Sequence, residues 1–293
     1  MAEMSKKIHF HDTEKLKQIN PETIKLWNKY KIDMSLRELS DKTVAGYTND
    51  IEHWLIYIYD NQGNQCVTDL DENDIEEFLY FCKTQGNNSR RMKRRMASIS
   101  AFYKFLRKKR LIQENPMEFI DRPKKDTDIL IQTYLTKDEV MLMKKRLKEH
   151  GDLLLETYAL FSLSTMARVT AIANLKWEQI NFEERACHDV LEKEGYKVDL
   201  FFSKEVSDLL LSLNQYYKDN KIECNGYVFV NKNTGKPMTT STFDSWCKII
   251  GNMIGEPTLH CHDFRHSGAT LLKNAGMTLE EISKLLNHAS TDV

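Results

Sequence analysis

A polar, charged stretch at residues 121–134 separates two parts of the chain whose hydrophobic patterns differ. It opens with Asp121-Arg122-Pro123-Lys124-Lys125, a composition typical of a linker. Before it, apolar residues recur at helical spacing, whereas after it helical segments alternate with short β-favouring runs. The 293 residues are enough for two domains of ordinary size. We therefore predict a short helix or mobile arm at 1–33, a helical domain at 34–120, the linker, and a second domain at 135–293.

The first of these domains is predicted to be entirely helical. A strong helix begins near Asp41 and ends at Asn61-Gln62-Gly63-Asn64. Asp71 then has the position of an N-cap, and the residues after it are acidic, which the helix dipole favours in a first turn. Gly86-Asn87-Asn88 ends that second helix, and a third runs from there to about residue 110.

The third helix is strongly basic. Between Arg90 and Arg110 it has many lysines and arginines and no acidic residue, although the whole chain has a net charge of only −1. A charge run is often just a solvated helix face, but a run of one sign on a near-neutral chain favours an anionic partner such as nucleic acid. The candidate DNA-binding residues are Arg90, Arg91, Lys93, Arg94, Arg95, Lys104 and Arg107.

The second domain is predicted to be α+β. A capping box, Thr136 with Glu139, starts helices at about 136–149 and 152–164, and further helices are expected at 204–219 and 240–253. Between Ile180 and Phe202, charged tips separate short β-favouring runs, which indicates a small antiparallel sheet. The run 227–230 is expected to form one more short strand.

A cluster of histidines and an arginine lies near the C-terminal end of the sequence. His262, Arg265 and His266 have the spacing that puts three side chains on one helix face. An arginine beside groups that move protons near neutral pH suits an oxyanion, and a phosphodiester above all. Two other readings are an ordinary polar helix face and a metal-dependent hydrolase using His260, His262, Asp263 and His266. No water-activating glutamate motif lies nearby to support the metal site.

Taken in order, these segments resemble the tyrosine recombinases, or phage-type integrases. Ser98–Leu106 followed by Glu114-Asn115-Pro116 is similar to the end of that family's helical core-binding domain, and Tyr134–Val140 to the start of its catalytic domain. The segment Ser164–Asn181 resembles the one with the family's first catalytic arginine. His262-Asp263-Phe264-Arg265 is similar to its H-x-x-R signature and Leu286-Asn287-His288 to its later L-G-H. The implied fold is an all-α, SAM-like core-binding domain followed by a mixed α+β catalytic domain.

The resemblance also implies a mechanism and a set of catalytic residues. Arg168 and Arg265 would hold the non-bridging oxygens of one phosphodiester and stabilise the transition state without a metal ion or cofactor. Lys193 in the predicted hairpin would protonate the leaving 5′ oxygen, with Lys197 as the alternative. His262 would assist proton transfer, and His288 would donate to the phosphate. A tyrosine would attack and form a 3′-phosphotyrosyl link.

The sequence departs from the family pattern at several positions. All twelve tyrosines precede His288, so the nucleophile is expected beyond Val293, and this polypeptide is expected to bind DNA without forming a covalent adduct. Ala171 stands where an acidic residue usually braces the first arginine, so a carboxylate would have to come from elsewhere. Met166-Ala167 stands where the family usually has Gly-Leu before the first arginine, and Asn287 stands where it usually has Gly before the later histidine.

Composition limits the remaining possibilities. No apolar run is long enough to cross a bilayer, and the polar start of the chain has no signal-peptide core. The six scattered cysteines lack metal spacing and indicate reduced thiols, so we expect a cytoplasmic, nucleoid-associated bacterial-type protein. The expected partners are double-stranded DNA with paired inverted half-sites and further copies of the chain, as dimers and tetramers. The rival function is a non-catalytic DNA-binding regulator with the same fold.

Overall fold

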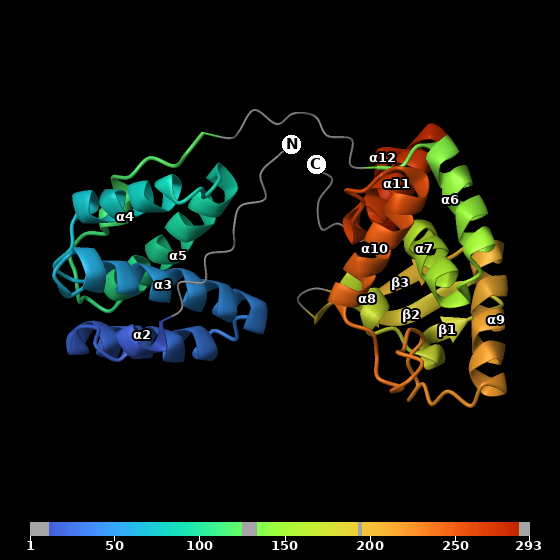
Figure 1. The fold of residues 1–293 in the computed structure, drawn as a ribbon, viewed down its shortest axis with the longest axis horizontal. Helices are drawn as coiled ribbons and strands as arrows, with labels where there is room; N and C mark the ends of the chain where they lie inside the picture. The colour runs from blue at the N-terminus through green and yellow to red at the C-terminus, as the bar shows by residue number, and fades with distance from the viewer. Residues whose placement is uncertain (1–11, 125–133, 193–194, 287–293) are drawn as a thin grey trace. The chain divides into compact units, whose positions relative to one another are not determined.

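The computed structural model describes residues 12–124, 134–192 and 195–286. The chain divides into two compact units, Met1–Ile129 and Leu130–Val293, and the division falls within the predicted linker (Figure 1). The N-terminal unit is helical, and the C-terminal unit combines helices with a small antiparallel sheet. The predicted fold class is therefore confirmed. No described helix is long and apolar enough to cross a membrane.

The N-terminal unit packs its helices around one apolar core. Within the described residues its elements are α1 (Thr13–Leu16), α2 (Pro21–Leu36), α3 (Asp41–Asn61), α4 (Glu72–Thr84), α5 (Ser89–Lys108) and the 3-10 turn η1 (Pro116–Glu118). Trp27, Trp54 and Phe102 are among its largest fully buried side chains. Asp71 caps α4 as predicted, and its carboxylate accepts from the backbone of Asn73 and Asp74.

The α2 helix does not end at the boundary predicted from the sequence. It crosses the predicted boundary at residues 33/34, and Leu26, Tyr30 and Met34 contribute to the same core as α3 and α5. Pro21 sits at the first helical position, where its missing N–H costs nothing, and the Asn20 side chain caps the start. The residues from Pro21 onward therefore pack as part of the helical unit.

The C-terminal unit is built around a buried helix. Its described helices are α6 (Lys137–His150), α7 (Leu153–Thr165), α8 (Val169–Ala173), α9 (Lys204–Asp219), α10 (Thr240–Ile254), α11 (Cys261–Asn274) and α12 (Leu279–Leu285), with a 3-10 turn η2 (Trp177–Gln179). α7 is buried around most of its circumference, as expected for a helix in the interior. It contacts α9, α11 and the last strand of the sheet (Figure 1).

The sheet has three antiparallel strands in sequence order. They are β1 (Ile180–Asn181), β2 (Ala186–Leu191) and β3 (Lys197–Phe201), and β2 pairs with both neighbours. The backbone N–H of Glu192 donates to the carbonyl of Tyr196 at 2.8 Å and closes the β2–β3 hairpin. The predicted additional strand at 227–230 is wrong: Val228, Phe229 and Val230 are fully buried, but the segment forms only isolated bridges, Lys176 with Tyr227 and Val230 with Pro237.

Candidate functional site

Arg168 lies at the turn between α7 and α8. Met166, which ends α7, adopts a left-handed backbone conformation with φ of 54°, a geometry that costs a non-glycine residue on the order of 1 kcal/mol. Arg168 follows as the N-cap of α8, with its side chain 33% exposed. It lines an open pocket of about 420 Å³ together with His262, Asp244 and Val169. The turn thus presents a permanent positive charge to solvent.

Arg265 is held below the surface of the same unit. It is only 5% exposed, and its guanidinium donates through Nη1 to the carbonyl of Met166 at 2.7 Å and through Nη2 to the carbonyl of Leu286. Burial and the nearby charge of Arg168 lower its pKa to about 10, so it stays positive at neutral pH. Arg265 therefore fixes the turn from which Arg168 projects.

A glycine allows α11 to approach α7 closely enough for this contact. A Cβ on Gly268 would lie 2.5 Å from the carbonyl oxygen of Leu163 and 2.5 Å from Cγ of Met166. Real Cβ atoms do not come that close, so a larger residue would push the two helices apart. Gly268 is one turn from Arg265 on α11, and it sets the spacing on which the Arg265–Met166 hydrogen bond depends.

The Glu192 carboxylate lies between the two arginines. Glu192 follows β2, and its side chain is 2% exposed. Its Oε2 pairs with Nη1 of Arg168, and its Oε1 is 3.9 Å from Nη1 of Arg265. A buried carboxylate between two guanidinium groups offsets part of their mutual repulsion. The sequence did not single out this residue, although the missing acid at Ala171 indicated that a carboxylate had to come from another segment.

His262 is exposed at the start of α11 and lines the pocket of Arg168. Its ring meets that of His266 edge to face, with centroids 4.6 Å apart. Partial desolvation of the ring and the charges of His266 and Arg265 lower the pKa of His262. The ring is therefore mainly neutral near pH 7 and able to accept a proton. Among the described residues, no group of three or more histidines, cysteines and acids is placed to hold a metal ion.

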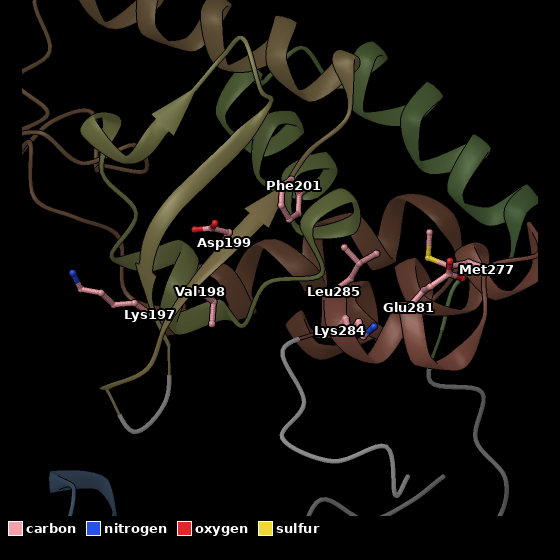
Figure 2. Close-up of a pocket in the computed structure, with 8 residues that line it drawn as sticks. All are labelled: Lys197, Val198, Asp199, Phe201, Met277, Glu281, Lys284 and Leu285. Carbon is pink, nitrogen blue, oxygen red and sulfur yellow. The ribbon is translucent and has the colours of Figure 1, made fainter.

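Two of the predicted catalytic residues, Lys193 and His288, lie outside the described residues. Lys197, the alternative lysine, is exposed on β3 and pairs with Asp189 at 3.4 Å. It lines a different pocket, of about 640 Å³, between β3 and α12 (Figure 2). That pocket shares no lining residue with the pocket of Arg168 and His262.

No tyrosine of the described chain lines the Arg168 pocket. Tyr158 reaches its wall indirectly, since its hydroxyl hydrogen-bonds Sγ of Cys261 at 3.2 Å, but its own side chain is fully buried. Burial raises the pKa of Tyr158 far above its usual value. A neutral, inaccessible phenol of this kind is unsuited to attack a phosphodiester.

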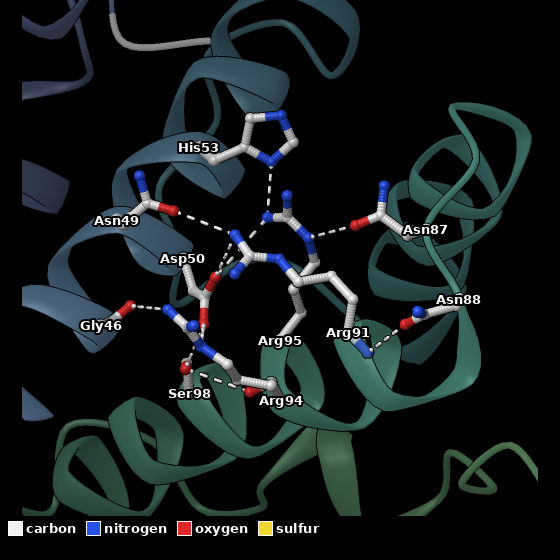
Figure 3. A network of polar contacts seen from close by, with 10 residues as sticks. All are labelled: Gly46, Asn49, Asp50, His53, Asn87, Asn88, Arg91, Arg94, Arg95 and Ser98. Atoms are coloured by element: carbon white, nitrogen blue, oxygen red, sulfur yellow. Dashed lines mark hydrogen bonds and ion pairs between the residues drawn. The ribbon is translucent and has the colours of Figure 1, made fainter. Parts of the chain in front are cut away.

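In the N-terminal unit, a buried aspartate organises the basic helix α5. Asp50 of α3 has a fully buried side chain, and Arg91, Arg94 and Arg95 converge on it with N–O distances of 3.1, 3.1 and 3.9 Å (Figure 3). The hydroxyl of Ser98 also donates to it, at 2.9 Å. Asp50 had no signal in the sequence beyond being an acid at an apolar position of a helix.

Arg95 differs from the other predicted DNA-binding residues because it points inward. It is 7% exposed, its Nε donates to Asn87 at 3.0 Å, and its Nη1 lies 2.7 Å from Nδ1 of His53 (Figure 3). A guanidinium can only donate, so this His53 nitrogen accepts and carries no proton. Burial and the charges of Arg95 and Arg91 lower the pKa of His53 to about 4.

The outer face of α5 combines basic and small residues. Arg90, Lys93 and Lys104 recur on one side of the helix, with Ala97 and Ala101 between them. The short side chains of the two alanines leave room for a polyanion to approach the helix. The longer basic side chains can then reach the polyanion on either side. Arg91 and Arg94 remain 33% and 49% exposed despite their pairing with Asp50. Arg107 pairs with Glu118 at 2.8 Å at the exposed end of the helix.

Comparison with known proteins places both units in one family. Residues 133–293 match the Phage integrase family, and residues 26–110 match the phage integrase N-terminal SAM-like domain. The chain is 27% identical over 268 residues to a tyrosine recombinase XerC of Pediococcus pentosaceus, covering 87% of this chain and 86% of the relative. It is 28% identical over 267 residues to a tyrosine recombinase XerD of Oceanobacillus iheyensis, covering 86% of each.

Solved structures show the same fold at lower identity. The Tn1549 transposon integrase in complex with transposon right end DNA is 20% identical, with a TM-score of 0.68 over 91% of each chain. A lambda integrase dimer bound to a COC′ core site is 15% identical, with a TM-score of 0.70 over 92% of this chain and 95% of that one. With both units matched in order, the chain belongs to the phage integrase family and has that family's SAM-like domain at its N-terminal side.

Proposed function

We propose that this protein is a tyrosine-type site-specific recombinase that cuts and rejoins double-stranded DNA through a 3′-phosphotyrosyl intermediate, without a metal ion. The observation that carries the proposal is the arginine pair in the C-terminal unit: Arg168 exposed at a pocket, and Arg265 fixed behind it through Met166. Two adjacent fixed positive charges suit a phosphodiester whose negative charge grows in the transition state. Matched relatives named as tyrosine recombinases support the same function.

In this proposal each residue of the pocket has a defined role. Arg168 binds a non-bridging oxygen with its exposed donors, and Arg265 adds fixed charge and holds the turn. His262, neutral near pH 7, accepts or relays a proton at the nucleophile. Lys193 as the acid for the leaving 5′ oxygen, and His288 as a phosphate donor, follow from the family pattern alone.

The α5 helix is proposed to bind the DNA backbone. Arg90, Lys93 and Lys104 would contact phosphates from its outer face, helped by Arg91, Arg94 and Arg107. Arg95 is assigned a role in positioning α5 and not in contacting phosphates, because its guanidinium is buried between Asn87 and His53. The expected DNA site has paired inverted half-sites bound by two copies of the chain, in line with the lambda integrase dimer on its core site.

Removing the charges of the α5 face should weaken binding in a salt-dependent way. Duplexes that bind the 1–293 polypeptide can be recovered by selection from a random library and footprinted for paired half-sites. For R90A/K93A/K104A, the slope of log affinity against log salt should become shallower by about 2.7, because each lost phosphate contact releases about 0.9 fewer counterions. The matched control is K25A/K29A/K31A, which removes three exposed lysines of α2 in the same unit. Equal slopes in the two variants would contradict the α5 assignment.

The 1–293 polypeptide itself should bind DNA without forming a covalent adduct. We infer this because no tyrosine of the described residues lines the Arg168 pocket, and because Tyr158, which contacts the pocket wall through Cys261, is buried and has a raised pKa. The measurement is incubation with a nicked suicide substrate made from the selected site, followed by denaturing electrophoresis. A denaturation-resistant protein–DNA band would disprove this point and confirm cleavage. Loss of that band in R168Q would assign cleavage to the Arg168 pocket, and its persistence in R168Q would count against the pocket.

A further inference from the structure

Glu192 is the described acid that contacts the arginine pair, and it reaches them from the β2–β3 hairpin. Its Oε2 pairs with Arg168, while its Oε1 is 3.9 Å from Arg265 and accepts no hydrogen bond from the described residues. Burial of a carboxylate is costly unless charge compensates it. Two guanidinium groups provide that compensation here, so the position of Glu192 and the position of the arginines depend on each other.

No acidic residue close to Arg168 in the sequence could pair with its guanidinium. Residues 157–177 contain neither aspartate nor glutamate, and the position three residues after Arg168 is Ala171, which is fully buried. Arg168 therefore has no carboxylate from its own turn or from α8. The hairpin supplies it instead, and the hydrogen bond from the Glu192 N–H to the Tyr196 carbonyl anchors the backbone from which the side chain extends.

Burial decides between two roles for this carboxylate. One role is a stand-in for phosphate that incoming DNA must displace, and the other is a brace that stays in place. The Glu192 side chain is 2% exposed, whereas that of Arg168 is 33% exposed and lines the open pocket. A phosphate would therefore approach Arg168 from the solvent side, opposite to Glu192. The two arginines and one glutamate also leave a net charge of +1, which matches a single phosphodiester.

We propose that Glu192 is a positioning residue that orients Arg168 for the scissile phosphate and offsets the repulsion between Arg168 and Arg265. This rests on the proposed function, because it assumes that the arginine pair binds a phosphodiester. Glu192 thus takes over, from the hairpin, the bracing that Ala171 cannot provide. The carboxylate does not touch the DNA and is not a catalytic residue.

The test compares binding to DNA with one phosphate neutralised at a time. Selected duplexes carrying single methylphosphonate substitutions are titrated with the 1–293 polypeptide and with R168Q. The phosphate that Arg168 contacts is the one whose neutralisation weakens binding about tenfold in the unaltered chain and not in R168Q. E192Q, which keeps the size of the side chain and removes its charge, is then measured at that phosphate, together with its urea unfolding.

We expect E192Q to bind unmodified DNA within about threefold of the unaltered chain, while the effect of neutralising that phosphate falls from about tenfold to about threefold or less. E192D should recover part of the effect, because it keeps the charge on a shorter side chain, and it gives the same comparison if E192Q does not fold. A tenfold effect that persists in folded E192Q would reduce Glu192 to a structural role and overturn the proposal. Tighter binding of unmodified DNA by E192Q would also overturn it, because that is the result expected if the carboxylate occupies the phosphate position and must be displaced. If no phosphate depends on Arg168 in the unaltered chain, the proposed function itself fails, and this inference with it.

Discussion

Replacing Arg265 with alanine should destabilise the C-terminal unit by about 3 kcal/mol, among the largest effects of any single substitution in that unit. The guanidinium is 5% exposed and donates to the backbone carbonyls of Met166 and Leu286. Truncation leaves both carbonyls without their donor and places Glu192 beside one positive charge instead of two. Each buried group left unsatisfied costs about 1–3 kcal/mol. The Met166 turn, and with it Arg168, should lose its fixed position.

Urea unfolding, combined with hydrogen exchange of α7 and α11 peptides, measures this effect. The stability of R265K is expected to fall between that of the unaltered chain and that of R265A. A lysine ammonium keeps the charge but lacks the planar fork that reaches both carbonyls. The matched control is R146A, which breaks an exposed pair with Glu149 on α6 and should cost no more than about 1 kcal/mol. Similar losses for R265A and R146A would show that the Met166 and Leu286 contacts do not hold the turn.

The helices were predictable because their signals are local. The α6 capping box of Thr136 and Glu139 forms as expected, and α9 begins and ends where the apolar period predicted. The sheet was predicted from the charged tips that separate β-favouring runs between Ile180 and Phe202. The run 227–230 shows the limit of such reasoning: its apolar residues are buried as predicted, but whether a buried run joins a sheet depends on partners elsewhere in the chain.

The candidate site was predictable only in part, and the residues missed share one physical property. Arg168, His262 and Arg265 could be named because their spacing and flanking residues match a family pattern. Glu192 and Asp50 are acids whose partners lie on other elements. Glu192, in the β2–β3 hairpin, pairs with arginines at the start of α8 and on α11, and Asp50 of α3 pairs with arginines of α5. Nothing in the local sequence marks such a pairing. For the same reason Arg95 looked like its exposed neighbours, although tertiary contacts with Asn87 and His53 turn it inward.

Replacing Asp50 with alanine should destabilise the N-terminal unit by about 3–5 kcal/mol, the cost of leaving a buried charge without its partner. Asp50 is fully buried, and Arg95, itself 7% exposed, would stay in the interior without a carboxylate. D50N keeps the hydrogen-bonding shape toward Ser98 and Arg94 and should cost less. The same change should weaken DNA binding, because Arg91 and Arg94 lose the contact that aims their exposed guanidinium groups along α5.

The measurement is urea unfolding followed by fluorescence of Trp27 and Trp54, both buried in this unit, with DNA affinity at fixed salt measured in parallel. D33A is the control, since Asp33 pairs with the exposed Arg37 of α2 at 3.4 Å, is itself 18% exposed, and should cost no more than about 1 kcal/mol when it is lost. If D50A loses stability but binds DNA as tightly as D33A, Asp50 serves the core alone. If both properties fall together, one buried carboxylate maintains the fold of the unit and aims its DNA-binding arginines. That second result is expected, because the three guanidinium groups converge on the same two oxygens.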